Sequence, residues 1–137
     1  MSDCLFCKII SGQIPSARVY EDNEIFAFLD IGPCRPGHTL VVPKLHIPTL
    51  FELPPDRAPA LVAALQRIGK AVMEATGATG LNVIQNNFED AGQTVFHAHW
   101  HLIPRHKDDG VKMWPQGSYP DAAAMQAMTE SIVSRLR

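Results

Sequence analysis

The sequence predicts an α+β fold in which a five-stranded antiparallel sheet carries one long helix and a C-terminal helix. Five β-prone runs occur along the chain, and the short polar links between neighbours suit antiparallel pairs. One longer stretch repeats its apolar positions at helical spacing. With 137 residues and 46% hydrophobic content, the chain has the length of one domain and enough apolar residues for a core.

The N-terminal part of the chain predicts a short helix followed by three strands. The helix is expected over residues 5–11 and ends at Gly12, because glycine suits the left-handed position after a helix. Strands are expected at residues 18–20, 25–29 and 39–42. The polar residues between the first two strands suggest a hairpin, and Pro43 stops the third.

The long helix is expected over residues 56–76, packed on the sheet. Its apolar residues recur at intervals of four, three and four, namely Leu61, Leu65, Ile68 and Val72. Asp56 is a possible N-cap, because its carboxylate can accept hydrogen bonds from free backbone N–H groups. Gly77 is the expected stop.

The fourth and fifth strands are expected at residues 80–86 and 94–103, as an antiparallel pair. Asn82 and Asn86 share one face of the fourth strand, and asparagine is unusual in strands, so the two suggest a polar site. A C-terminal helix is expected to present one apolar face, formed by Met125, Met128, Ile132 and Leu136. That face is interpreted as core or dimer contact rather than as a binding groove.

Composition argues against several classes of protein. A net charge of −2 without blocks of like charge indicates no nucleic-acid surface. No run reaches the roughly 18 apolar residues that span a membrane, and no secretory signal is found, so a cytoplasmic protein is expected. Three cysteines, Cys4, Cys7 and Cys34, argue against a disulfide framework. The spacing of Cys4 and Cys7 fits half a metal site, a redox pair or chance.

Three histidines, His97, His99 and His101, alternate with apolar residues. In a strand they would share one surface. Three interpretations follow, namely a solvated face without function, a zinc site and covalent catalysis by a neutral imidazole. The preceding Gly92, Gln93 and Thr94 suit phosphate oxygens, which a site for metal alone does not need. Two of the histidines outside this run, His38 and His106, are expected to be ordinary surface or loop residues.

Residues 92–105 resemble the signature of the histidine triad family, in which three histidines alternate with apolar residues. Other landmarks of that family have counterparts in the same order: Cys4 to Ile10, Ile14 to Ser16, Phe28 to Ile31, Gly37 to Lys44, and His46. The resemblance covers about residues 4–107. A single domain over residues 1–137 is therefore expected, with its core at 4–107, a tail at 108–137 and homodimer formation as in relatives.

The resemblance implies hydrolysis or transfer on nucleoside 5′-monophosphates, of purines here, that are joined to an amine, a sulfate or another nucleotide. By position, His99 would attack the α-phosphorus, His101 would contact phosphate oxygens, and His97 would orient the nucleophile or help to protonate the leaving group. The resemblance also assigns Asn86, Gln93 and Thr94 to the phosphate, Asp30 to the ribose, and Phe6, Ile9, Phe28 and Ile31 to the base. An apolar slot and a carboxylate suit these partners chemically.

The resemblance also implies a structural zinc ion. In relatives with the same pair of cysteines, the ligands correspond to Cys4, Cys7, His46 and His97. The alternative to an enzyme is a regulatory or scaffold protein that binds zinc and nucleotide with little turnover. His101 argues against the branch that has glutamine at that position, and residues 114–117 depart from the Trp-Pro-Pro-Gly motif of phosphoramidase-like members. The leaving group, an amine or a nucleotide, therefore stays open.

Overall fold

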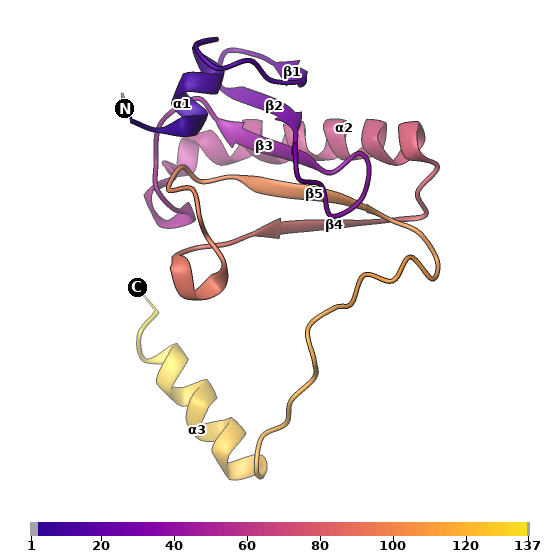
Figure 1. Cartoon of the computed structure of the whole chain (residues 1–137). Coiled ribbons are helices and arrows are strands. Elements are labelled where there is room, and N and C mark those ends of the chain that lie inside the picture. Colours follow the sequence, from indigo (N-terminus) through magenta and orange to yellow (C-terminus); the bar gives the residue numbers. More distant parts are fainter. Residues whose placement is uncertain (1–2, 137) are drawn as a thin grey trace.

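The computed structural model describes residues 3–136, and it confirms the α+β fold with a five-stranded antiparallel sheet (Figure 1). The order across the sheet is β1-β2-β3-β5-β4. The main elements are α1 (Leu5–Ile10), β1 (Arg18–Glu21), β2 (Ile25–Leu29), β3 (Thr39–Pro43), α2 (Ala58–Thr76), β4 (Gly80–Gln85), β5 (Trp100–Arg105) and α3 (Ala122–Val133). Three short 3₁₀ turns, η1 (Leu50–Glu52), η2 (Pro55–Arg57) and η3 (Glu89–Ala91), complete the described secondary structure.

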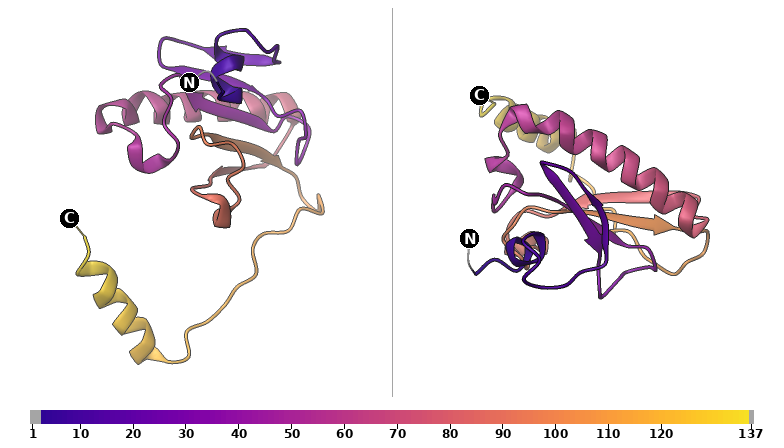
Figure 2. Two further views of the ribbon diagram at one scale, coloured as in Figure 1. Left: turned by 60° about the vertical axis from the view of Figure 1, so that its left-hand side comes forward. Right: turned by 90° about the horizontal axis from the view of Figure 1, so that it is seen from above.

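The two faces of the sheet carry separate apolar clusters, because alternate residues of each strand point in opposite directions. On one face Ile25, Val41 and Trp100 pack with the buried side of α2. On the other face Phe26, Phe28, Leu40 and Val42 pack with Phe6 and Ile9 of α1. Seen from above, α1 and α2 lie on opposite sides of the sheet (Figure 2). Both faces of the central strands are therefore buried.

The long helix begins two residues later than the sequence predicts. α2 starts at Ala58, and Asp56 lies in the turn η2 without the expected role as N-cap. Pro55 opens that turn, while Pro59 occupies the first turn of α2, where its missing N–H has no partner to lose. The predicted stop is confirmed, since Gly77 has a left-handed φ of 69°.

The strand that carries the histidines is shorter than predicted. β5 begins at Trp100, which makes the first pairs of this strand, with Val41 of β3 and Gln85 of β4, while β3 itself continues to Pro43 beside β2. The preceding segment is held instead by the Ala98 N–H, which donates to the Ile47 carbonyl at 2.7 Å. The alternation of faces nevertheless continues upstream of Trp100, with Ala98 in the cluster under α2.

β4 also ends one residue early, at Gln85, so Asn86 follows the strand. The expectation that Asn82 and Asn86 form one polar site is wrong. The Asn82 carboxamide oxygen accepts a hydrogen bond from Arg105 Nη1 at 2.8 Å, and Arg105 is also bound to the Asp109 carboxylate. Asn82 therefore fixes the turn after β5.

The chain after β5 leaves the body of the molecule as an extended arm that ends in α3 (Figures 1 and 2). None of the residues of α3 is buried, and Met125, Met128 and Ile132 each expose about half of their surface. Of the two alternatives expected for this apolar face, core or dimer contact, the structure excludes the core of the same chain. Within residues 3–136, none of the helices has the length and apolar character needed to cross a bilayer.

Candidate functional site

A pocket of about 310 Å³ opens on the α1 face of the sheet, beside the histidines. It brings together most of the residues that the sequence assigned to a nucleotide. Its lining includes Phe6, Ile9, Phe28, Asp30, Ile31, Thr94, His99 and His101. The lining within the described chain does not include Asn86, Gln93 or His97. The pocket combines an apolar slot with a small polar end, which is typical of sites for planar ligands that carry a charged group.

The ring of His99 is oriented by two neighbours. Its Nδ1 donates to the His97 carbonyl at 2.7 Å, because a carbonyl oxygen can only accept. The ring also meets Phe6 edge to face, with centroids 5.0 Å apart. In the neutral ring the proton therefore sits on Nδ1, and Nε2 keeps a free electron pair at the pocket wall.

His101 is oriented by His38, and the expectation that His38 is an ordinary surface or loop residue is wrong. His38 is only 6% exposed, and its Nδ1 accepts the Cys34 backbone N–H at 3.0 Å. The proton of neutral His38 therefore sits on Nε2, which donates to His101 Nδ1 at 2.9 Å. His101 in turn carries its own proton on Nε2, as a hydrogen-bond donor.

Burial keeps these imidazoles uncharged at neutral pH. It lowers the pKa of His101 to about 4, with repulsion from His99 and His38 adding to the effect. Burial also lowers the pKa of His38 and of His99, while the Asp30 carboxylate opposes part of the change in both. Asp30 Oδ2 lies 3.7 Å from His38 Nε2, and Oδ1 accepts the Gly32 N–H at 2.8 Å.

His97 points away from the pocket and toward the two N-terminal cysteines. Its Nε2 donates to the Pro43 carbonyl at 2.7 Å, so its Nδ1 is unprotonated in the neutral ring. That nitrogen lies 3.5 Å from Cys4 Sγ, 3.6 Å from Cys7 Sγ and 3.2 Å from His46 Nδ1. Burial lowers the pKa of His97 to about 4.

The ligand atoms of Cys4, Cys7, His46 and His97 all lie within 4.8 Å of one another, which makes them a candidate metal site. The N-cap geometry of α1 contributes to it, because the Cys4 thiol accepts the Cys7 N–H at 3.4 Å and so fixes both sulfurs near the helix start. Two cysteines and two histidines form a donor set for a closed, structural metal site. His97 Nε2 is bonded to the Pro43 carbonyl and its Nδ1 faces the cluster, so His97 is not placed to move protons in the pocket.

The segment expected to hold phosphate is divided in the structure. Thr94 is exposed and lines the pocket, whereas Gln93 is buried and its amide Nε2 donates to the Pro48 and Val95 carbonyls. The Asn86 side chain lies against Gly92, where an added Cβ would come within 3.6 Å of Nδ2. Ile31 stands fully exposed at the rim. One signal could have revealed His38. Alternate residues of a strand share a face, so His38 lies on the same face as Leu40, and Leu40 pairs with His101 of β5.

The family assignment follows from a match to the HIT domain model over residues 11–108. The chain belongs to the HIT family, a family of nucleotide hydrolases. Protein hit of Bacillus subtilis is 50% identical over 109 residues, which are 79% of this chain and 75% of that protein. The crystal structure of SMU.412c from Streptococcus mutans has a TM-score of 0.94 at 46% identity and covers 100% of this chain and 87% of its own.

Other HIT relatives carry names that describe an activity or a metal. Adenosine 5′-monophosphoramidase hnt1 of Schizosaccharomyces pombe is 37% identical over 98% of both chains. Adenylylsulfatase HINT3 of Arabidopsis thaliana is 44% identical over 79% of this chain and 55% of its own length. A zinc-bound histidine triad protein of Mycobacterium smegmatis has a TM-score of 0.77 at 36% identity, with 98% of this chain and 99% of that chain covered.

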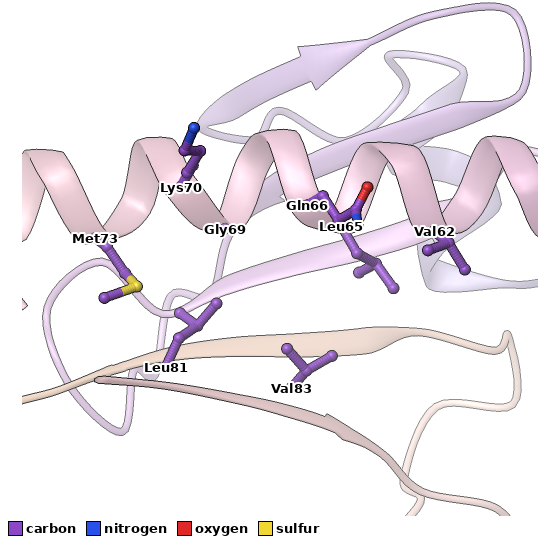
Figure 3. A pocket seen from close by; sticks show the side chains of 8 residues that line it. All are labelled: Val62, Leu65, Gln66, Gly69, Lys70, Met73, Leu81 and Val83. Atoms are coloured by element: carbon purple, nitrogen blue, oxygen red, sulfur yellow. The ribbon is translucent and has the colours of Figure 1, made fainter. Parts of the chain in front are cut away.

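A second and larger hollow, about 710 Å³ in volume, lies between α2 and β4, away from the histidines (Figure 3). It is lined by Val62, Leu65, Gln66, Gly69, Lys70, Met73, Leu81 and Val83. Apart from Lys70, none of these side chains is titratable or nucleophilic. The hollow is an apolar surface groove and not a second catalytic centre.

Proposed function

We propose that the chain is a nucleotide hydrolase that forms a covalent nucleotidyl-histidine intermediate on His99. The substrate class is a purine nucleoside 5′-monophosphate joined through its phosphate to an amine or to a second nucleotide. One observation carries the proposal: the hydrogen bond from His99 Nδ1 to the His97 carbonyl leaves the Nε2 electron pair free at the wall of the pocket. The names of the phosphoramidase and adenylylsulfatase relatives support the reaction type.

In the first step the His99 Nε2 electron pair attacks the α-phosphorus and forms a P–N bond. The bond to the leaving group breaks with its electron pair, so that a phosphate-linked group departs as an anion and an amine departs neutral after taking a proton from solvent. The His97 carbonyl oxygen, which accepts the hydrogen bond from His99 Nδ1–H, stabilises the positive charge that develops on the ring. The His101 Nε2–H donates to a phosphate oxygen, in the tautomer that His38 imposes.

In the second step water attacks the same phosphorus and the P–N bond breaks. The electron pair returns to His99 Nε2, the water proton passes to solvent, and the nucleoside monophosphate leaves. Asp30 would accept the ribose hydroxyls, and the slot between Phe6 and Phe28 would take the base. Thr94 and Asn86 would hold phosphate oxygens, and Gln93 would contribute by fixing that segment from beneath.

We also propose that zinc occupies the Cys4–Cys7–His46–His97 cluster in a structural role. Tetrahedral zinc, with bonds of about 2.0 to 2.1 Å to nitrogen and about 2.3 Å to sulfur, separates two nitrogens by about 3.3 Å and nitrogen from sulfur by about 3.6 Å. The corresponding separations are 3.2 Å between the nitrogens of His46 and His97 and 3.4 to 3.6 Å from nitrogen to sulfur. The fit supports zinc, which would hold His97 and thereby the carbonyl that orients His99.

We further propose that the chain forms a homodimer. Two apolar surfaces of this chain lie open, namely the exposed face of α3 and the groove of Figure 3. Because no residue of α3 is buried within its own chain, we assign its exposed apolar face to a second copy. In sedimentation velocity, Met128→Lys is expected to give monomers, while the control Gln126→Lys, on another side of α3, stays dimeric. Equal behaviour of both variants would contradict this assignment.

The proposed activity is tested by single-turnover assays with adenosine 5′-phosphoramidate. Wild type is expected to release adenosine 5′-monophosphate, and His99→Ala is expected to release it at least a hundredfold more slowly. Absence of turnover by wild type on phosphoramidates and on dinucleoside polyphosphates alike, with nucleotide still bound, would favour the regulatory or scaffold alternative.

A further inference from the structure

Two exposed phenylalanines, Phe51 and Phe88, stack on each other beside the segment that leads to the pocket. Their ring centroids are 6.1 Å apart, and their planes differ by only 19°. Phe51 is 73% exposed and Phe88 is 56% exposed, so that both present ring surface to solvent. Two adjacent aromatic rings in water are an unusual use of large apolar side chains unless they contact a further group.

The backbone at Phe88 adopts a conformation that side chains rarely take. Its φ is 73° and its ψ is 161°, a region that is populated almost only by glycine. Two hydrogen bonds to Gln93 stabilise this conformation. The side-chain Oε1 of Gln93 accepts the Phe88 N–H at 2.7 Å, and the backbone N–H of Gln93 donates to the Phe88 carbonyl at 3.1 Å. Since the ring is exposed, packing in the core does not explain why a large aromatic residue stands here.

The same glutamine fixes the loop that carries Phe51. Gln93 Nε2 donates to the Pro48 carbonyl at 2.6 Å, and the Leu50 N–H donates to the Asn87 carboxamide at 2.8 Å. One buried side chain therefore holds both aromatic loops together. The residue that follows Gln93, Thr94, lines the nucleotide pocket. The stacked pair is thus connected through Gln93 and Thr94 to the polar end of the pocket.

We propose that Phe51 and Phe88 form a stacking platform for a planar aromatic ring in the leaving group, such as the base of a second nucleotide. This inference rests on the proposed function and selects among its substrate classes. A base in the slot between Phe6 and Phe28 leaves the rest of the substrate to extend past the phosphate-binding end of the pocket. Aromatic faces stack on any base without hydrogen-bond readout, which suits a leaving group of variable identity.

The test compares kcat/KM for diadenosine tetraphosphate, which would release ATP as the leaving group, with kcat/KM for adenosine 5′-phosphoramidate. In Phe51→Leu and Phe88→Gly, the ratio of the first value to the second is expected to fall about tenfold. Phe51→Tyr keeps an aromatic face and is expected to keep the ratio. Phe88→Gly is suited to the test because glycine adopts this backbone conformation without strain, so loss of folding does not mimic the effect.

A direct binding measurement separates this inference from the proposed reaction. In the His99→Gly background, Phe51→Leu is expected to weaken binding of diadenosine tetraphosphate about tenfold more than binding of adenosine 5′-monophosphate. Equal changes for both ligands, or an unchanged ratio in all variants, would overturn the platform. A shift of sedimentation in Phe51→Leu without a change in the ratio would overturn it in favour of a contact between copies. If wild type does not turn over either substrate but Phe51→Leu still selectively weakens binding of diadenosine tetraphosphate, only the proposed hydrolysis is refuted.

Discussion

Substitution of His38 tests whether this residue controls the tautomer of His101. In the wild type, the Cys34 N–H occupies His38 Nδ1, and His38 Nε2–H donates to His101 Nδ1 at 2.9 Å. In His38→Asn the carboxamide oxygen can replace Nδ1 and still accept the Cys34 N–H, but it leaves His101 Nδ1 without a donor. In His38→Gln the carboxamide NH₂ can replace Nε2 and keep that donor, at the expense of the bond to Cys34.

The two variants each lose one of the two hydrogen bonds of His38 and differ in chemistry. Loss of one such bond destabilises the protein by about 1 kcal/mol, and by up to about 3 kcal/mol where the group left behind is buried. Only His38→Asn releases the His101 ring to take its other tautomer, with the proton turned away from the phosphate. Losing a hydrogen bond of this strength is expected to slow nucleotidyl transfer by roughly 10- to 100-fold in His38→Asn, and clearly less in His38→Gln.

The assay is single-turnover release of product from adenosine 5′-phosphoramidate, together with ¹⁵N NMR of the imidazole rings. NMR reports the His101 tautomer directly, which a merely structural role of His38 would not change. Wild type and His38→Gln are expected to show His101 protonated on Nε2, and His38→Asn a mixture of tautomers. Equal rates in both variants, with an unchanged His101 tautomer, would refute the reasoning.

Three further predictions concern metal, pH and backbone. Cys4→Ser and Cys7→Ser are each expected to lose bound zinc in elemental analysis and to unfold at a lower temperature. The control Cys34→Ser, which lies outside the cluster, is expected to keep its zinc. If wild-type protein purified without chelator contains no zinc, the site is contradicted. Because the pKa of His101 falls from about 6.5 in the unfolded chain to about 4 in the folded one, its neutral ring stabilises the fold above pH ~6.5, and this contribution is lost as the pH falls toward 4. Urea titrations should therefore show wild type losing up to about 3 kcal/mol more than His101→Gln between pH 7 and 4, and parallel curves would exclude the effect. Gly37→Ala is expected to lower the free energy of unfolding by at least 1 kcal/mol, because φ at Gly37 is +97° and the new Cβ would lie 2.6 Å from Cγ2 of Thr76 at the end of α2. An unchanged urea midpoint would refute this prediction.

The sequence predicted the strands and the long helix well, because their apolar periods report directly which face is buried. It placed the ends of the elements less well. The start of β5 depends on where β3 and β4 stop pairing, at Val41 and Gln85, and that limit is not encoded near the histidines themselves. The start of α2 was displaced by a turn opened by Pro55, which competes with the cap expected at Asp56.

Residues of the candidate site that belong to a sequence motif could be predicted. Residues whose role depends on a contact between distant parts of the chain could not. His99 and His101 stand in a recognisable pattern and line the pocket. His38 was missed because its partner His101 is 63 positions away, and a single histidine before a strand has no distinctive pattern. The burial of Gln93 was equally hidden, since its amide serves Pro48 and Val95 rather than the pocket.

The three histidines of the triad differ because each has a different backbone or side-chain partner. The bond to Pro43 leaves His97 Nδ1 unprotonated beside the cysteines, and the bond to the His97 carbonyl leaves His99 Nε2 unprotonated at the pocket. The bond from His38 leaves the proton of His101 on Nε2. Each tautomer follows from one hydrogen bond, so the division of roles depends on three contacts. The central claim of this account is that His99 Nε2 is the nucleophile.

The most direct test is intact-protein mass spectrometry after rapid mixing with adenosine 5′-phosphoramidate and acid-free quenching. Wild type is expected to gain the mass of one adenylyl group, with the modification mapped to His99 by peptide fragmentation. His99→Ala should show no adduct, whereas His101→Gln should still form it more slowly. Turnover by wild type without any adduct on the millisecond to second scale, or an adduct that persists in His99→Ala, would contradict the account.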